Sequence, residues 1–455
     1  AMASTQLAEL LQQRIRAEGP ISLARFMREC LTHPELGYYV SRADIGAHGD
    51  FTTSPEQTPV FSRLLAKWCD WSYEAMGSPE YFRLIELGPG TGKNISNLLP
   101  ALSPATRKAA HVHLVEISPL LRDRQAAALG VTAAAHAEKN DLVVRAPSEE
   151  IPASYTQPYR GGTVEVSAND YPLEMSSQWT NEAGAAEYVA QWGKEEVPVS
   201  WHEHVSLVPD GPAVVVANEF FDALPIHQFQ YDAGHQGFTQ TVVDADIDAL
   251  CLMQETTPPP AVTWRGGNGS LITGEGFEIC PEAILVGRHI GKRIASHGGA
   301  ALIIDYGEEE TSSTTRAVSR KGSNLGRGFV ESLSVLTSPG EVDVTADVHF
   351  RALGEALKHA GRDAMTVHPL TPQAYLLTEL IDTKLPDYMR IMKRGYEEGM
   401  PEDEEEVYHL APLIDRKGLG TQFKCMCAAP ASYGQPVGWR WRDQLLEIEK
   451  LGRLS

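Results

Sequence analysis

The sequence predicts an α/β fold whose centre is a parallel β-sheet covered by helices on both faces. The expected strands are four short apolar runs at residues 81–87, 112–116, 213–217 and 300–304. Their apolar residues are continuous rather than alternating with polar ones, which is typical of strands buried on both faces. Helical patterns separate these runs, and strands that alternate with helices favour a parallel sheet. A glycine-rich turn follows the first run.

The length of 455 residues exceeds what one hydrophobic core usually serves, so we expect additions to the central sheet. Residues 1–80 are expected to form a helical region with a lid loop, residues 81–310 the core, and residues 311–455 an additional region for substrate. Leu7, Leu10, Leu11 and Ile15 recur at helical spacing, and Ser22 can cap a second helix. Polar or broken stretches predict an insertion at 131–199 and loops at 33–59, 256–276 and 308–328.

The charge and the cysteines restrict the partners and the compartment. The chain carries 60 Asp and Glu against 39 Lys and Arg, a formal charge of −21, which repels phosphate backbones and anionic lipid surfaces. We therefore expect no nucleic-acid partner. No apolar run reaches the roughly 20 residues that cross a bilayer. The 6 cysteines lack Cys-x-x-Cys spacing, which predicts buried, reduced thiols rather than a zinc or redox site.

The glycine-rich turn predicts a nucleoside cofactor. Gly88, Gly90 and Gly92 follow the first expected strand and precede a helical pattern, and glycines there let the backbone approach a ligand closely. Glu116 lies 24 residues beyond Gly92, at the end of the second strand, where a carboxylate can accept hydrogen bonds from both ribose hydroxyls. Lys93 occupies the position of the third glycine of a dinucleotide-binding motif, which argues against a nicotinamide-dependent oxidoreductase.

An acidic residue, Glu86, stands just before the turn. Glycines spaced Gly-x-Gly-x-Gly after an acid resemble the first motif of S-adenosylmethionine-dependent methyltransferases. We therefore expect Glu86, the three glycines and Glu116 to bind S-adenosylmethionine. The alternative for Glu86 is a strand-end carboxylate satisfied by neighbouring backbone amides.

Further motifs resemble the MidA-like methyltransferases, a family that includes a mitochondrial protein arginine methyltransferase serving respiratory complex I assembly. They lie at residues 49–56, 116–119, 217–225 and 304–307, with a weaker one at 343–348. The most specific is the segment Asn-Glu-Phe-Phe-Asp-Ala-Leu-Pro within 217–225. The resemblance implies a Rossmann-like class I methyltransferase sheet with S-adenosylmethionine as cofactor. A missing histidine at 328–332 and the insertion at 131–199 depart from the family and leave the substrate open.

Three polar residues directly after the third strand are the candidate catalytic group. Methyl transfer from a sulfonium is an in-line displacement, which requires alignment and exclusion of water but no metal. If the nucleophile is an arginine guanidinium, as the resemblance implies, carboxylates must hold its charge. We expect Glu219 to orient the substrate, Asn218 to add a polar contact and Asp222 to support the loop. The alternative is a capped strand-to-helix turn with two incidental acids.

The loop at 49–56 is expected to cover the cofactor, with Thr53 and Ser54 in contact with it. Its alternative is a packed connection without ligand contact. Asp305, at the end of the fourth strand, either lines the same cleft or forms a turn.

The resemblance implies a protein arginine N-methyltransferase whose substrate is a protein with an exposed arginine, such as a respiratory complex I subunit. The alternatives are an assembly factor that keeps the cofactor pocket but acts mainly by binding its client, and a small-molecule methyltransferase. We expect the mitochondrial matrix, with a targeting peptide removed before Ala1, or else the cytoplasm. A homodimer is left open.

Overall fold

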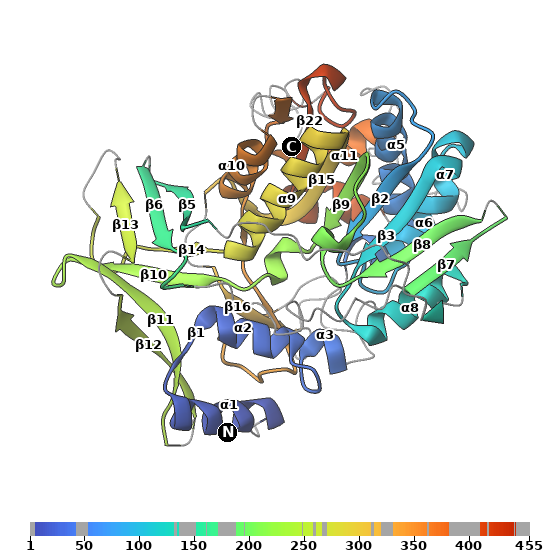
Figure 1. The fold of residues 1–455 in the computed structure, drawn as a ribbon. Helices are drawn as coiled ribbons and strands as arrows, with labels where there is room; N and C mark the ends of the chain where they lie inside the picture. The colour runs from blue at the N-terminus through green and yellow to red at the C-terminus, as the bar shows by residue number, and fades with distance from the viewer. Residues whose placement is uncertain are drawn as a thin grey trace, which may run out of the picture.

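A computed structural model of the chain describes most of its residues (Figure 1). The described residues are 5–41, 53–131, 134–135, 152–160, 162–171, 188–194, 196–247, 249–257, 261–265, 271–310, 314–319, 331–361, 364–381, 410–415, 418–440 and 442. Among them, no helix has both the length and the apolar composition that crossing a membrane requires. The cysteines all lie in these ranges as free thiols, and most of them are buried, as the sequence predicts.

The main sheet has eleven strands, and the four expected strands lie side by side within it (Figure 1). They are β15 (Gly299–Glu308), β9 (Ala213–Asn218), β2 (Phe82–Leu87) and β3 (Ala110–Val115), in that order and parallel to one another. Beyond β3 follow the parallel strand β8 (Val197–His202), then β7 (Tyr188–Trp192) and β4 (Ala134–Ala135). Beyond β15 follow β22 (Phe423–Pro430) and β20 (Met365–Val367), with β19 (Val348–His349) beside β15 and β21 (Thr371–Pro372) beside β22. The predicted α/β fold is confirmed.

Helices cover both faces of this sheet because alternate residues of each central strand point to opposite sides. Leu84 of β2 packs in one hydrophobic cluster with α5 (Pro59–Ala75) and α6 (Lys93–Ala101). Ile85 packs on the opposite face with α9 (Pro281–His297) and α10 (Phe350–Gly361). The other helices along this part of the chain are α7 (Pro104–Ala109), α8 (Pro119–Leu129), α11 (Gln373–Leu380), α14 (Ala411–Ile414) and α15 (Leu419–Gln422).

Three smaller sheets accompany the main sheet. The five-stranded one contains β1 (Ile21–Ser22), β10 (His227–Asp232), β11 (Gly237–Ala245), β12 (Leu250–Thr256) and β14 (Gly276–Ile279). The others contain β5 (Ser154–Tyr159), β6 (Gly162–Ser167) and β13 (Val262–Arg265), and β16 (Arg316–Ser319), β17 (Glu331–Leu333) and β18 (Asp343–Thr345).

The N-terminal helices pack against the five-stranded sheet and share a hydrophobic cluster with β11 and β18. They are α1 (Gln6–Glu18) and α2 (Leu23–Thr32). The Ser22 hydroxyl accepts a hydrogen bond from the Arg25 N–H at 3.0 Å, so the predicted cap of the second helix is confirmed.

The stretches expected as loops contain regular structure. Residues 33–59 include two short helices, α3 (Tyr38–Ser41) and α4 (Ser54–Gln57), while residues 42–52, with the first half of the expected lid, lie outside the described residues. β13 lies within 256–276, and β16 within 308–328. These strands pair with partners distant in the chain, such as β6 and β18, so their local sequence carries little strand signal. The division at residues 80 and 310 stays a prediction.

Candidate active site

The glycine-rich turn connects β2 to α6 and leaves open space above one of its residues. Gly88, Gly90 and Gly92 have φ of 61°, 53° and 81°, a left-handed conformation that glycine adopts without strain. A Cβ on Gly88 would lie 2.9 Å from the Phe220 ring, and one on Gly92 2.8 Å from Gln125 Cα. A Cβ on Gly90 would meet no atom within 4 Å. Two glycines are thus required by packing, and the third borders a space that a ligand can fill.

Glu86 is buried at the end of β2, and only one of its carboxylate oxygens is paired. The Asn94 amide donates to Glu86 Oε1 at 2.9 Å, while Oε2 has no donor. Burial raises the pKa of Glu86 to about 7, and the hydrogen bond from Asn94 opposes the rise. Its partner is therefore a side-chain amide from α6 rather than the backbone amides of the alternative interpretation.

Glu116 is buried directly after β3 and is tied to the glycine-rich turn through Gln125. Its Oε1 accepts the Ser118 N–H at 2.9 Å and its Oε2 accepts the Gln125 amide at 3.2 Å. The same amide donates to the Gly90 carbonyl at 2.8 Å, and the Trp201 indole donates to Gln125 Oε1 at 2.9 Å. Burial raises the pKa of Glu116 to about 7 despite these donors. Sequence reasoning missed Gln125, because nothing marks one polar residue of α8 as the one that faces the turn.

Helix α4 joins the glycine-rich turn to the candidate catalytic group. The Thr91 hydroxyl and the Lys93 ammonium both donate to the Glu56 carboxylate. Ser54 is buried, and its N–H donates to Glu219 Oε1 at 3.0 Å, whereas Thr53 precedes the helix in extended backbone. The structure therefore places Ser54 against Glu219, and Glu56, which the sequence did not single out, against the turn.

Glu219 adopts a strained backbone conformation directly after β9. Its φ of 52° is left-handed, which costs a residue with a side chain about 1–3 kcal/mol and is concentrated at functional sites. Its Oε1 accepts the Asn218 amide at 3.2 Å as well as the Ser54 N–H, and its Oε2 has no donor. Burial raises the pKa of Glu219 to about 8, with smaller contributions from the Asp222 and Asp343 charges.

Asp305 holds the turn that follows Glu219. This fully buried residue accepts the N–H groups of Phe220 at 3.2 Å, Phe221 at 3.0 Å and Asp222 at 3.4 Å on its Oδ2. Its hydrogen bonds match the turn-forming alternative for Asp305, in a turn beside the candidate catalytic group. Burial and the neighbouring Asp222 and Glu219 raise the pKa of Asp305 well above its ordinary value.

Asp222 is buried and bound by two hydroxyl groups. Its Oδ2 accepts from the Tyr306 hydroxyl and, at 2.9 Å, from the Thr345 hydroxyl, while Oδ1 has no donor. Nearby, the Tyr39 hydroxyl of α3 lies 3.0 Å from both oxygens of Asp343. Sequence motifs contained Tyr306, Thr345 and Asp343, but no pattern showed that β15 and β18 would meet at Asp222 or that α3 would reach Asp343.

Unpaired acceptor oxygens gather at this edge of the sheet. Within the part of the chain that the structure describes, the buried side-chain carboxylate and amide oxygens without a donor belong to Glu86, Asn94, Asn218, Glu219 and Asp222. All five lie at or just after the carboxyl ends of β2 and β9. A buried acceptor without a donor is costly, so these oxygens are suited to N–H donors and positive charge supplied by ligands. The open space at Gly90 and these acceptors fit a cationic nucleoside such as S-adenosylmethionine.

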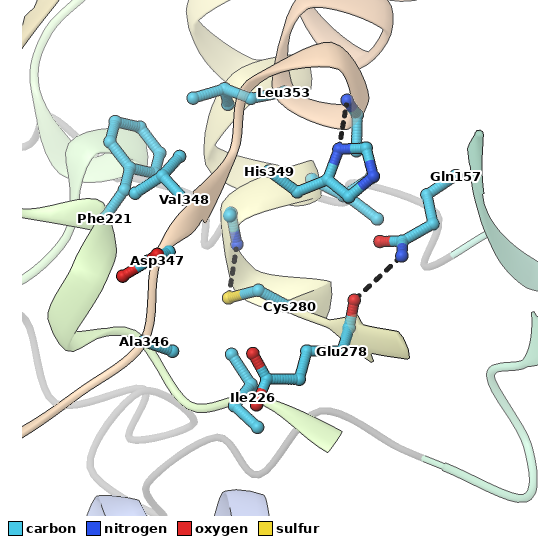
Figure 2. A pocket seen from close by; sticks show the side chains of 13 residues that line it. Gln157, Phe221, Ile226, Glu278, Cys280, Ala346, Asp347, Val348, His349 and Leu353 are labelled. Carbon is cyan, nitrogen blue, oxygen red and sulfur yellow. Dashed lines mark hydrogen bonds between the residues drawn. The ribbon is translucent and has the colours of Figure 1, made fainter. Parts of the chain in front are cut away.

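A pocket that Phe221 and Ala346 help to line, behind the turn after β9, has the opposite character (Figure 2). The Gln157 amide donates to the Glu278 carbonyl at 2.8 Å. Glu278 Oε1 accepts the Gln228 amide at 3.1 Å, and its Oε2 accepts the Thr314 hydroxyl at 2.9 Å. His349 Nδ1 accepts the N–H of residue 352 at 3.2 Å, which leaves Nε2 to donate to the carbonyl of residue 158 at 3.2 Å. Gln157, Glu278 and His349 are therefore engaged by hydrogen bonds, unlike the acids at the carboxyl ends of β2 and β9.

Comparisons with known proteins agree with this site. The chain belongs to the family of S-adenosyl-L-methionine-dependent methyltransferases, whose family model matches residues 64–368. Protein arginine methyltransferase NDUFAF7, mitochondrial, of Rattus norvegicus is 32% identical over 450 residues, covering 94% of this chain and 89% of that protein. The Danio rerio protein of the same name is 33% identical over 388 residues, covering 82% and 76%.

A solved structure supports the fold. A Burkholderia thailandensis protein crystallised with S-adenosyl-homocysteine has a TM-score of 0.60 and 22% identity, covering 95% of this chain and 94% of that one. The predicted methyltransferase family, enzyme class and S-adenosylmethionine cofactor are thus confirmed, and the relatives are named mitochondrial. The roles of individual residues stay predictions.

Proposed function

We propose that this methyltransferase transfers the methyl group of S-adenosylmethionine to an arginine side chain of a protein. The observation that carries the proposal is the pair of unpaired carboxylate oxygens, Glu219 Oε2 and Asp222 Oδ1, on one turn after β9. A guanidinium presents several N–H donors and a permanent positive charge, which matches such a pair. Glu219 orients this cation, Asn218 adds a polar contact, and Asp222 belongs to the same turn. The relatives named as protein arginine methyltransferases support the substrate class.

The cofactor is held by the glycine-rich turn and the acids on either side of it. Gly88, Gly90 and Gly92 shape the space, and Glu86 offers its free Oε2 to a cationic group. Glu116 keeps lone pairs for ribose hydroxyls although it already accepts two hydrogen bonds. Thr53 and Ser54, which connect this space to Glu219, close it on the other side. When bound, S-adenosylmethionine supplies the electrophilic methyl group.

The location is proposed from the relatives' names, and the protein client from the resemblance to the MidA-like methyltransferases. The relatives are called mitochondrial, and we place the present protein in the mitochondrial matrix, with a respiratory complex I subunit as its client. A homodimer is the proposed assembly. The alternative is an assembly factor that binds the client without needing to methylate it, and the experiment on Glu219 separates the two.

Substitution Glu219→Gln removes the charge and keeps the shape, so methyl transfer should fall by about 10²-fold while cofactor binding persists. The measurement is incorporation of labelled methyl groups into proteins of a mitochondrial lysate, with S-adenosyl-homocysteine affinity measured by calorimetry. A matched control is Glu278→Gln in the pocket of Figure 2, which should leave the labelling rate per folded protein unchanged. Equal labelling by wild type and Glu219→Gln would remove Glu219 from the mechanism. No labelling by either would favour the client binder.

A further inference from the structure

Methylation of an arginine side chain leaves a proton to be removed. In the reaction proposed above, a guanidinium nitrogen forms a bond to the methyl carbon while the carbon–sulfur bond breaks and its electron pair goes to sulfur. The positive charge of the sulfonium thereby passes to the guanidinium. One N–H proton must then leave, so that the product keeps a single positive charge. The acceptor must be a basic group within hydrogen-bond reach of the guanidinium.

Two acids near Glu219 are already engaged on both oxygens. Asp305 Oδ1 accepts the Tyr306 N–H at 2.9 Å, its Oδ2 accepts the N–H groups of the following turn, and the residue is fully buried. Asp343 receives the Tyr39 hydroxyl at 3.0 Å from each oxygen. Glu219 and Asp222 are the acids of this turn that each retain an oxygen without a donor.

Glu219 is built to remain charged when a cation is bound. The donors on its Oε1 are the Ser54 N–H and the Asn218 amide, and N–H groups of this kind donate but do not accept. Their protons cannot be turned away as those of hydroxyls can, so both donors favour the carboxylate over the carboxylic acid. Burial raises the pKa of Glu219 to about 8, and an adjacent guanidinium would lower that pKa again.

Asp222 is surrounded by groups that can accommodate either protonation state. Its Oδ2 is bound by the hydroxyls of Tyr306 and Thr345, which also contact each other. A hydroxyl can rotate, so when Oδ1 is protonated the Tyr306 and Thr345 hydroxyls can turn their protons away from Oδ2, toward each other or, for Thr345, toward the Asp222 carbonyl. Oδ1 is buried and without a donor, which leaves it available to the guanidinium.

Since Asp222 differs from Glu219 in this way, we propose that Asp222 is the catalytic residue that accepts the guanidinium proton on Oδ1. Tyr306 and Thr345 are positioning residues that hold Asp222 before and after the transfer. The proton passes to solvent when the methylated product leaves. This assignment rests on the proposed function, and it gives Asp222 a chemical role beyond support of the loop.

The charged surroundings of Asp222 set the pH dependence of the transfer. Burial raises the pKa of Asp222, while the hydroxyls of Tyr306 and Thr345 and the charge of Arg316 oppose the rise. The titratable and charged groups around it are Glu219 after β9, Asp305 and Tyr306 on β15, Asp343 on β18, Tyr39 on α3 and Arg316 on β16. The rate should therefore rise with pH as Asp222 ionises and then level off.

The test compares wild type with Asp222→Asn and Tyr306→Phe between pH 6 and 9. The readout is methylarginine recovered by acid hydrolysis from mitochondrial-lysate proteins incubated with labelled S-adenosylmethionine. Asp222→Asn should lower the rate by about 10²-fold and reduce its rise with pH to the part that ionisation of Glu219 contributes, while the dissociation constant of S-adenosyl-homocysteine stays within about twofold. Tyr306→Phe removes a donor to the ionised acid, so the rise should move to higher pH and the rate should recover there.

A second readout does not depend on turnover. Methylguanidinium binding to the protein loaded with S-adenosyl-homocysteine is measured by calorimetry at pH 6.5 in two buffers of different ionisation enthalpy. Wild type should release more protons on binding than Asp222→Asn, because the cation ionises Asp222. The matched control, Asp244→Asn on β11, should behave as wild type in both experiments.

The outcomes distinguish failure of the role assigned to Asp222 from failure of the proposed arginine methylation. Methylarginine formed by wild type and Asp222→Asn at equal rates, or with the same pH profile, would overturn the role of Asp222 and leave arginine methylation standing. Equal proton release by the two proteins would do the same. If wild type forms no methylarginine, the proposed function itself fails, and the assignment falls with it. Should Asp222→Asn fail to fold, an unshifted pH profile of Tyr306→Phe would overturn the proposal.

Discussion

The carboxyl edge of β2 and β9 and the pocket of Figure 2 are both lined by buried polar groups, yet they differ in how these groups are paired. At the sheet edge, Glu86, Glu219 and Asp222 each retain an oxygen without a donor. Around the pocket, Glu278 and His349 are bound by neighbouring side chains and backbone. Buried polar groups are normally satisfied, so the exceptions mark where a ligand completes the structure.

Backbone conformation follows the same division. The glycine-rich turn contains three left-handed glycines, and Glu219 is left-handed although it carries a side chain. Asp305 supports that conformation through three N–H groups of the next residues. At Glu219 a left-handed backbone and an unpaired buried carboxylate oxygen therefore occur in the same residue, which is a stronger indication of function than the presence of a pocket.

The largest effects are expected when one acid is removed from each region. They test whether the sheet edge binds a ligand while the pocket residues stabilise the fold. Glu116→Ala should weaken S-adenosyl-homocysteine binding by about 1.5 to 3 kcal/mol, the range for a hydrogen bond to a charged group. Glu278→Ala should lower the free energy of unfolding by a similar amount, because its donors become unsatisfied, and leave that affinity unchanged. Calorimetric titration and chemical denaturation of both variants measure the two quantities. An unchanged affinity in Glu116→Ala would assign this acid a structural role.

The central strands could be predicted from the sequence because burial on both faces produces continuous apolar runs. Of the expected insertion at 131–199, β7 and the start of β8 extend the main sheet. The short strands β13 and β16 could not be predicted. Their stability comes from pairing with β6, β17 and β18, which local composition does not reveal.

A smaller effect is expected from a methyl group added to the glycine-rich turn. Gly90 and Gly130 have similar φ, 53° and 66°, and a Cβ at either would meet no atom within 4 Å. Substitution of either by alanine should therefore cost about 1 kcal/mol of stability through left-handed strain. Only Gly90→Ala should raise the dissociation constant of S-adenosyl-homocysteine, by about tenfold or roughly 1.4 kcal/mol. Equal affinities in the two variants, measured by titration, would show that the space at Gly90 is not the cofactor's.

Site residues inside motifs were predicted, and those brought in by packing were not. Glu86, Glu116 and Glu219 follow strands at positions that the turn chemistry indicates. Gln125 reaches the site from α8, and Thr345 reaches it from β18. Their participation depends on how helices and strands pack, which one sequence does not show. Asp305 was ambiguous because a turn-forming acid and a cleft-lining acid have the same local pattern.

The smallest expected effect is on how the free energy of unfolding depends on pH. Glu219 in the site and His202 in the core change it in opposite directions. Burial raises the folded-state pKa of Glu219 from 4.5 to about 8. Between pH 4.5 and about 8 the folded protein therefore binds more protons than the unfolded one. The contribution of Glu219 to the free energy of unfolding is thus fully present below pH 4.5 and is lost as pH rises to about 8. Burial lowers the pKa of His202, which hydrogen-bonds to His113 at 2.9 Å, from 6.5 to about 4. Between about pH 4 and 6.5 the unfolded protein binds more protons than the folded one. The contribution of His202 to the free energy of unfolding is therefore present above pH 6.5 and is lost as pH falls.

Between pH 4.5 and 6.5 the two contributions nearly cancel, and substitution of one group should reveal the other. Glu219→Gln should make the free energy of unfolding rise more steeply with pH, and His202→Gln should make it rise less steeply or fall. Each change of slope is at most about 1.4 kcal/mol per pH unit, the value for one proton. Urea denaturation at several pH values measures these slopes, with Asp244→Asn as the control that should follow wild type. If Glu219→Gln left the slope unchanged, Glu219 would be ionised in the empty protein, and the unpaired Oε2 would have to be hydrated rather than reserved for a cation.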